Sequence, residues 1–131
     1  MITLLVDHHM EGKARRLERV LSTSGWDEFA AFRFVSVSQA GLAMDSSDRV
    51  IWRYAQTHGM LLLTDNRNMK GIDSLEQTLR EENTAEALPV ITIGSSRRLD
   101  EREYRERCAV RLIEIAMDLQ QYLGAGRLFI P

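Results

Sequence analysis

The sequence is short of residues that would support several common classes of protein. Its only cysteine, Cys108, has no partner for an internal disulfide, and a single thiol fits a reducing compartment such as the cytoplasm. Two prolines and eight scattered glycines provide no linker, and we find no internal repeat. We therefore expect residues 1–131 to form one domain, and we interpret Cys108 as a buried, small apolar residue.

Long hydrophobic runs and an excess of positive charge are also missing. The longest apolar stretches span only a few residues, which predicts neither a membrane span nor a secretory signal. The formal net charge is −2, so the chain has no general attraction to phosphate backbones or anionic lipid. Any contact with nucleic acid must come from a local arrangement of basic residues. We expect a cytoplasmic protein without a membrane partner.

The sequence does have the composition of a folded domain, with 44% hydrophobic and 27% charged residues. Residues 2–6 are a continuous apolar run that ends at Asp7, which predicts a strand buried on both faces. Residues 12–24 place Leu17, Val20 and Leu21 on one side of a helix and basic residues on the other. The chain therefore begins with a strand followed by an amphipathic helix.

This alternation continues along the chain. Further strands are predicted at residues 34–37, 60–64, 90–93 and 128–130. Further helices are predicted from a cap at Ser46 or Ser47 to about His58, from a capping box at Asp73 to Glu82, and from a second capping box at Asp100 to Tyr122. Strands that alternate with helices predict a three-layer α/β/α domain with a mostly parallel central sheet.

Polar residues follow two of the predicted buried strands. Asp7, His8 and His9 come after the first strand, and Thr64-Asp65-Asn66-Arg67-Asn68 stands at the end of the 60–64 strand. In an open parallel sheet, ligands bind beyond the carboxyl ends of the strands, where the loops diverge. We therefore expect both clusters to lie on the same edge of the sheet.

Carboxylates brought together at such an edge repel one another, and a bound cation relieves that repulsion. Asp7, Asp48 and Asp65 are the candidates, and oxygen ligands of this kind suit Mg²⁺ or Mn²⁺. Metal-assisted hydrolysis of phosphodiesters is the chemistry that follows. The alternative is that these aspartates serve only as helix caps and turn formers. Asp45 and Asp48 are the weakest metal candidates, because a capping role alone explains either of them.

The two adjacent histidines raise the question of a zinc site. Neighbouring residues in an extended chain point to opposite faces, so we expect at most one of His8 and His9 in the crevice. The remaining candidates, His58 and Cys108, stand in predicted helices away from the sheet edge. We therefore do not predict a zinc site. The four residues VDHH also match the DHH phosphoesterases, but the further acidic motifs of those enzymes are missing, and we treat the match as coincidence.

A longer match covers most of the first 70 residues. Its parts are Leu5-Val6-Asp7-His8-His9; Gly41-Leu42 followed by Asp48-Arg49-Val50-Ile51 and Ala55; and Thr64-Asp65-Asn66-Arg67-Asn68. In this order the motifs resemble those of the PIN-like superfamily, in particular the small bacterial PIN-like proteins of predicted toxin–antitoxin operons. There the corresponding patterns are Leu-x-Asp-Glu-Asn, a Gly-Leu loop with Asp-x-x-Ile-x-x-x-Ala, and Thr-x-Asp-x-Asp-Phe.

The resemblance implies a PIN-type fold and, for active members, cleavage of single-stranded RNA by acidic residues that hold Mg²⁺ or Mn²⁺. Asp7 and Asp48 match two of the metal-binding acids of the family. Asp65 lies one residue before the third such position, which Asn66 occupies, and the fourth is Asn68. The glutamate that usually follows the first aspartate is replaced here by His8.

The first hypothesis is therefore a metal-dependent ribonuclease. A toxin-type PIN nuclease with an antitoxin protein as partner is one form of it. His8 is the candidate for proton transfer, and Arg67 is the candidate for holding the scissile phosphate. The candidate metal ligands are Asp7, Asp48, Asp65, Asn66 and Asn68.

The second hypothesis is a catalytically weak or inactive PIN-like domain that binds a protein or nucleic acid. The long helix predicted at residues 100–122 has enough apolar positions to cover the sheet and part of a neighbour, which makes a homodimer an option. A third hypothesis, a small-molecule enzyme on a nucleotide-binding sheet, ranks last because no glycine-rich loop follows the first strand.

Overall fold

The computed structural model describes residues 1–23, 25–66 and 71–131 of the chain. Within them, five strands form one sheet in the order β2-β1-β3-β4-β5, and every neighbouring pair is parallel. The strands are β1 (Ile2–Val6), β2 (Phe32–Ser36), β3 (Leu61–Thr64), β4 (Val90–Ile93) and β5 (Arg127–Ile130). The longer helices are α1 (Glu11–Thr23), α2 (Asp48–Thr57), α3 (Leu75–Glu82) and α4 (Arg102–Met117). The predicted α/β fold class is confirmed.

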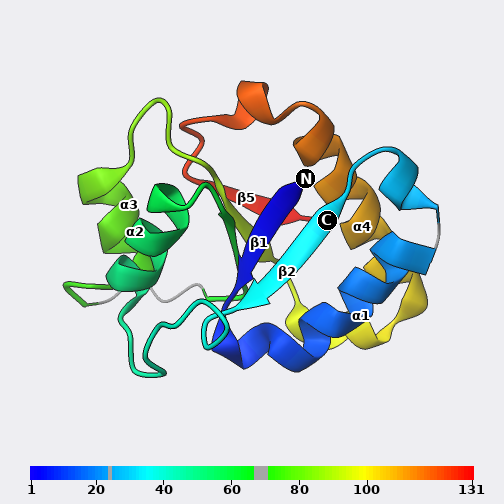
Figure 1. The fold of residues 1–131 in the computed structure, drawn as a ribbon, viewed down its shortest axis with the longest axis horizontal. Coiled ribbons are helices and arrows are strands. Elements are labelled where there is room, and N and C mark those ends of the chain that lie inside the picture. The colour runs from blue at the N-terminus through cyan, green and yellow to red at the C-terminus, as the bar shows by residue number, and fades with distance from the viewer. Residues whose placement is uncertain (24, 67–70) are drawn as a thin grey trace.

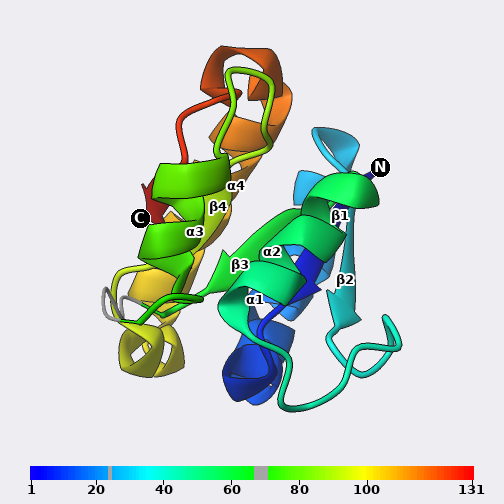
Figure 2. The same cartoon turned by 90° about the vertical axis from the view of Figure 1, so that its left-hand side faces the viewer.

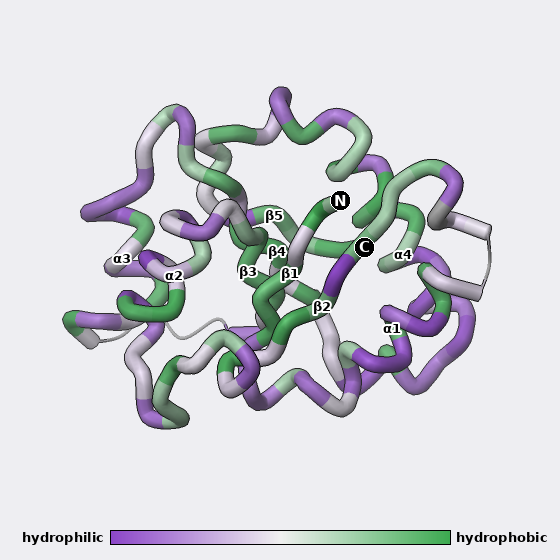
Figure 3. The backbone as a smooth tube through the Cα atoms, viewed as in Figure 1, coloured by the Kyte–Doolittle hydropathy of each residue, from purple (hydrophilic) through white to green (hydrophobic). Residues whose placement is uncertain are grey.

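The helices cover both faces of the sheet, so the molecule has three layers (Figures 1 and 2). Side chains of β1 alternate between the faces: Leu4 packs with α1 and α4, whereas Leu5 packs with α2 and α3. Apolar residues line both sides of the sheet, and Figure 3 shows them along the central strands while polar residues dominate the outer helices. This two-sided burial is the reason that the strands appear as continuous apolar runs.

The order of the strands creates a crevice between β1 and β3. These two strands are neighbours, with Val6 opposite Leu63. After β1 the chain passes to α1 on one face of the sheet, whereas after β3 it passes to α3 on the other face. Loops that leave adjacent parallel strands in opposite directions leave an opening at the carboxyl edge, where ligands bind in such folds.

The prediction for α2 is confirmed at both ends. Ser47 is the N-cap, and its Oγ accepts a hydrogen bond from Val50 N at 3.2 Å. His58 is the C-cap, and Gly59 follows with φ +66°, a left-handed conformation that glycine adopts without strain. Asp48 is thereby fixed as the first residue of the helix.

The predicted start of α3 is wrong by one residue. Ser74 is the cap, and its Oγ accepts from Gln77 N at 3.2 Å. The side chain of Asp73 instead accepts a hydrogen bond from Arg49 Nε at 3.0 Å. Asp73, which the capping-box pattern assigned to the start of α3, therefore forms a long-range ion pair with Arg49.

The boundaries predicted for α4 are wrong at both ends. Asp100 ends a short 3-10 helix (Ser96–Asp100) and pairs with Arg16 of α1, and the N-cap of α4 is Glu101. At the other end α4 stops at Met117, and a separate 3-10 helix (Leu119–Tyr122) continues. The strands β1 and β4 have their predicted bounds, and the remaining elements differ from prediction by at most two residues. Ser24, the expected end of α1, lies outside the described residues.

Cys108 lies on the buried face of α4, as expected for a small apolar residue. Burial raises the pKa of its thiol to about 11, so the thiolate is disfavoured.

Among the described residues, no helix combines the length and the apolar composition that crossing a bilayer requires.

An ion-pair network joins α2 to α3 on the outer side of the domain. Arg49 pairs with Asp73, Glu81 and Glu82, and it donates to the carbonyl of Ile72 at 2.7 Å. Arg53 makes two further bonds of 2.8 Å to the Glu82 carboxylate. Hydrogen bonds from both arginines lower the pKa of Glu82 from its usual value of 4.5 to about 2, and the larger contribution comes from Arg53.

This network predicts a pH-dependent contribution to stability. A carboxyl whose pKa is lowered by folding stabilises the fold above its unfolded pKa, and that contribution disappears as the pH falls toward its folded pKa. The unfolding midpoint of Glu82→Gln should therefore lie below that of the wild type at neutral pH, and the gap should narrow between pH 4.5 and about 2. Urea unfolding across this pH range measures it.

Glu86→Gln is the matched control, because Glu86 is exposed and forms no ion pair within the described part of the chain. Its midpoint should follow that of the wild type at every pH. A gap for Glu82→Gln that stays constant down to pH 3 would contradict the assignment.

Candidate functional site

A polar pocket of about 370 Å³ lies at the carboxyl edge of β1 and β3. Three separate parts of the chain line it: the segment after β1, the start of α2 with the loop before it, and the segment after β3. The lining residues are Asp7, His8, His9, Ser46, Asp48, Ile51, Asp65 and Asn66. The pocket is therefore at the crevice that the strand order creates.

Asp7 is the most buried polar residue of the pocket and is held on two sides. Its backbone N–H extends the β1–β3 ladder by donating to Leu63 O at 3.0 Å. Its Oδ2 accepts from the hydroxyl of Thr64 at 2.9 Å, and Thr64 itself is fully buried at the end of β3. The carboxylate is thus fixed in orientation, with Oδ1 lying 3.3 Å from His8 Nδ1.

Asp48 ties the start of α2 to two other segments. Its Oδ2 accepts from Asn66 Nδ2 at 2.8 Å and from the backbone N–H of Leu75 at 3.1 Å. The second bond satisfies the first N–H of α3, which no carbonyl within that helix can reach. Asp48 therefore has a structural role, while no described donor bonds its Oδ1.

These bonds form one continuous network across the pocket. Thr64 Oγ1 donates to Asp7 and accepts from Asn66 N at 3.0 Å, while the side chain of Asn66 donates to Asp48. We call these four residues the Asp7–Asp48 network. Because its donors point at both carboxylates, it stabilises the two charges inside the protein without an ion.

The expectation that at most one histidine enters the crevice is wrong. The chain does not stay extended after Asp7 but turns at once into a 3-10 helix, η1 (His8–Met10). The rings of His8 and His9 consequently pack together, with centroids 4.0 Å apart, and both line the pocket. His58 bonds Tyr54 O on α2 and does not line the pocket.

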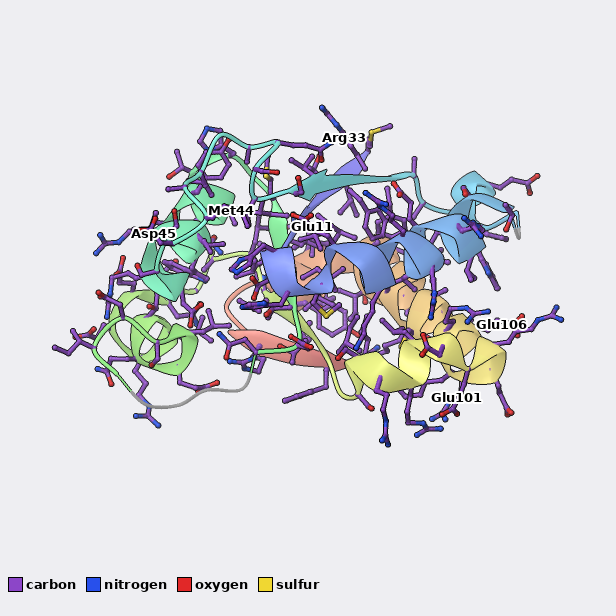
Figure 4. All side chains as sticks on the ribbon, turned by 90° about the horizontal axis from the view of Figure 1, so that it is seen from below. Glu11, Arg33, Met44, Asp45, Glu101 and Glu106 are labelled. Atoms are coloured by element: carbon purple, nitrogen blue, oxygen red, sulfur yellow. The ribbon has the colours of Figure 1, made fainter. Side chains whose placement is uncertain are left out.

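The structure brings Asp7, Asp48 and Asp65 to one pocket. Asp65 and Asn66 both line it, although the sequence left open which of the two does. Asp45 is exposed in the preceding loop, outside the lining residues (Figure 4). Arg67 and Asn68 lie outside the described residues. In ranges 1–23, 25–66 and 71–131, no three acidic, imidazole or thiol groups approach closely enough to hold one metal ion.

Arg127 supports the pocket and was not found from the sequence. It begins β5, and its side chain is only 10% exposed. Its Nη1 donates to the carbonyl of Asn66 at 2.7 Å and to Thr92 Oγ1 at 2.8 Å, while Nε donates to Glu76 at 2.8 Å. Arg127 thus anchors the segment after β3 to β4, β5 and α3. Since Glu76 and Asn66 are far from Arg127 in the sequence, no local sequence pattern predicts these contacts.

Thr64 belongs to one of the sequence motifs, which assigned it no role, although it joins β3 to Asp7. The sequence pattern that could have identified Thr64 was a hydroxyl residue at the last position of an otherwise aliphatic strand.

Comparison with protein-family models, curated proteins and solved structures finds no match to this chain. Support for a function therefore comes from the geometry of the pocket and from the motif resemblance.

The contacts of Arg127 predict a measurable loss of stability on truncation. Arg127→Met leaves Glu76 and the Asn66 carbonyl without their donor, and we expect a loss of roughly 1–3 kcal/mol in the free energy of unfolding. The double variant Arg127→Met/Glu76→Met should recover part of this loss, because no unpaired carboxylate remains. Urea denaturation measures both.

Arg33→Met is the control, since Arg33 is exposed on the edge strand β2 and makes no ion pair with a described residue. Equal losses for Arg127→Met and Arg33→Met would show that Arg127 does not anchor the pocket.

Proposed function

We propose that this chain is a metal-dependent nuclease that cleaves single-stranded RNA, with Asp7, Asp48 and Asp65 as the ligands of Mg²⁺ or Mn²⁺. The observation that supports this is the meeting of three aspartates, from three separate parts of the chain, in one pocket at the carboxyl edge of a parallel sheet. The PIN-like motifs described above support the same activity.

The chemistry of the donor groups fits a hard divalent cation. Carboxylate and amide oxygens are the ligands that Mg²⁺ and Mn²⁺ prefer. Asp7 Oδ1 and Asp48 Oδ1 accept no hydrogen bond from any described residue, so each aspartate offers one oxygen. Because no three acidic, imidazole or thiol groups approach closely enough in the described ranges, ion binding requires a rearrangement that brings the three aspartates closer together. A bound ion would activate water and offset charge on the reacting phosphate.

The residues around the ligands have positioning roles in this proposal. Thr64 fixes the carboxylate of Asp7, and Asn66 fixes that of Asp48. Since Nδ1 of His8 lies beside Asp7, Nε2 is the nitrogen that would exchange a proton with the substrate.

The roles of Arg67 and Asn68 stay predictions, as do an antitoxin partner, a homodimer and a cytoplasmic location.

The proposal predicts cleavage that depends on both the metal and Asp7. Wild-type protein should cleave a labelled single-stranded RNA with Mn²⁺ or Mg²⁺, and a chelator should abolish the reaction. Asp7→Asn should lower the rate roughly a hundredfold or more, because the amide keeps the bond from Thr64 but removes the charge of a ligand. Gel analysis of the cleavage products measures the rate.

Asp45→Asn provides the matched control, because it makes the same charge change in the adjoining loop, outside the pocket. Its rate should equal that of the wild type. If wild-type protein leaves RNA intact with every divalent ion tried, or if Asp7→Asn and Asp45→Asn cleave equally, the nuclease proposal fails.

A second candidate is a non-catalytic domain that binds a protein or nucleic acid. The Asn66–Asp48 hydrogen bond favours it, because an amide N–H already supplies the positive partner that a cation would provide. In this alternative the network serves only to hold α2, α3 and the end of β3 together.

Asn66→Asp separates the two candidates. The change replaces the donor to Asp48 by a second carboxylate, so we expect the metal-free protein to lose roughly 1–3 kcal/mol of unfolding free energy. If the pocket holds an ion, Mn²⁺ should restore this loss and raise the midpoint beyond the shift seen for wild type. Thermal unfolding with and without Mn²⁺ measures both effects.

Asn83→Asp is the control, because Asn83 Nδ2 also donates a hydrogen bond, to Gly124 O at 2.9 Å, but lies outside the pocket. Its midpoint should not respond to Mn²⁺. If Asn66→Asp is destabilised and equally unresponsive, the non-catalytic candidate is the better one.

A further inference from the structure

A second polar groove, of about 350 Å³, lies between α1 and α4. Four of the side chains that line it are arginines and only one is acidic. The lining residues are Arg16, Arg19, Val20, Thr23, Arg102, Arg105 and Glu106. We call it the arginine groove. In a chain whose net charge is −2, this is a local concentration of positive charge contributed by two helices.

Within the described part of the chain, two of these arginines have carboxylate partners and two do not. Arg16 pairs with Asp100, and Arg102 pairs with Glu106 at 3.0 Å, one turn along α4. Arg19 on α1 and Arg105 on α4 form no ion pair with any residue that the structure describes. The groove therefore contains two cationic side chains whose charges are not neutralised by a direct contact.

Arg105 is held in place by the backbone. It is half-buried, and its Nη1 donates to the carbonyls of Leu99 and Asp100, both at 2.9 Å. Carbonyls orient the guanidinium but do not cancel its charge, so the remaining N–H groups are available to an anion in a fixed geometry. Preorganisation of this kind lowers the entropic cost of binding a ligand.

We propose that the arginine groove binds the phosphates of a single-stranded nucleic acid. The guanidinium fork matches the geometry of phosphate oxygens, and an anion placed between Arg19 and Arg105 would offset their mutual repulsion. The proposal rests on the proposed function in one respect, namely that the bound strand is also the substrate of the Asp7 pocket.

The position of the groove suits that role. Figure 4 views the domain from the side where α1 begins at Glu11, and the start of α4, which carries Glu106, lies beside α1. Glu11 follows Asp7 by four residues. At about 1.5 Å of rise per residue, Arg16 and Arg19 lie roughly 7 and 12 Å further along the helix. Measured along the axis of α1, the groove therefore lies within the span of a few nucleotides from the residues that follow β1.

The test is binding of a short, fluorescein-labelled single-stranded RNA, followed by anisotropy in the presence of a chelator so that no cleavage occurs. Arg19→Gln should weaken binding roughly tenfold and leave the fold intact, because this side chain is exposed. The logarithm of the binding constant decreases with the logarithm of the salt concentration. The slope of this plot should become shallower by roughly 0.7 for each phosphate that the variant no longer neutralises. Arg105→Gln should behave alike, and circular dichroism checks that both variants are folded.

Arg33→Gln is the matched control, since Arg33 is exposed on β2 and lies far from Glu106 in Figure 4. Its affinity and salt slope should equal those of the wild type. Unlabelled competitors identify the anion: oligonucleotide should displace the probe, whereas inorganic phosphate and polyglutamate at equal charge should not. Displacement by phosphate would reassign the groove to isolated phosphate, and displacement by polyglutamate would overturn a phosphate site altogether.

The proposal is overturned if wild-type protein does not bind the RNA at low salt, or if Arg19→Gln binds as tightly as Arg33→Gln. Its failure is separate from that of the nuclease. Binding that depends on Arg19, without cleavage in Mn²⁺, keeps the groove and rejects the enzyme; cleavage that does not depend on Arg19 keeps the enzyme and rejects the groove.

Discussion

The hydrogen bond from Thr64 to Asp7 is the contact on which the candidate site depends. The Thr64 hydroxyl is buried between two central strands, where an unpaired polar group would be costly. Because the same oxygen accepts from Asn66 N, one side chain sets both the orientation of the Asp7 carboxylate and the path of the chain as it leaves β3. That path carries the amide of Asn66 to Asp48, so the geometry on both sides of the pocket follows from the end of one strand.

The amide of Asn66 changes the balance of charge in the pocket. An amide N–H directed at Asp48 stabilises its carboxylate, whereas a carboxylate at this position would repel it and require a cation. A metal ion that uses Asp48 would therefore meet a carboxylate of which one oxygen, Oδ2, already accepts two hydrogen bonds. An ion bound here would therefore gain less from the relief of repulsion than it would in a pocket of unpaired carboxylates.

Much of the fold follows from local sequence, whereas the site follows from long-range contacts. Buried strands with polar residues at their ends predicted the parallel sheet and placed Asp7 and Asp65 at one edge. The strand order, which places β1 beside β3 and opens the crevice, has no local pattern. The two wrong helix caps have one feature in common: Asp73 and Asp100 each pair with an arginine of another helix. The turn that brings His9 into the pocket depends on the conformation after Asp7.

The net charge of the chain hides an unequal distribution. An acidic pocket by itself repels a nucleic acid, so a nuclease of this design needs positive charge both at the pocket and along the path of the strand. A cation would supply the first, and the arginine groove the second. The two contributions differ in kind, because the cation is exchangeable and the arginines are held by α1 and α4. Binding of a strand at the groove would consequently depend on salt even where its cleavage depends on metal, so the two proposed functions make separate demands on the surface.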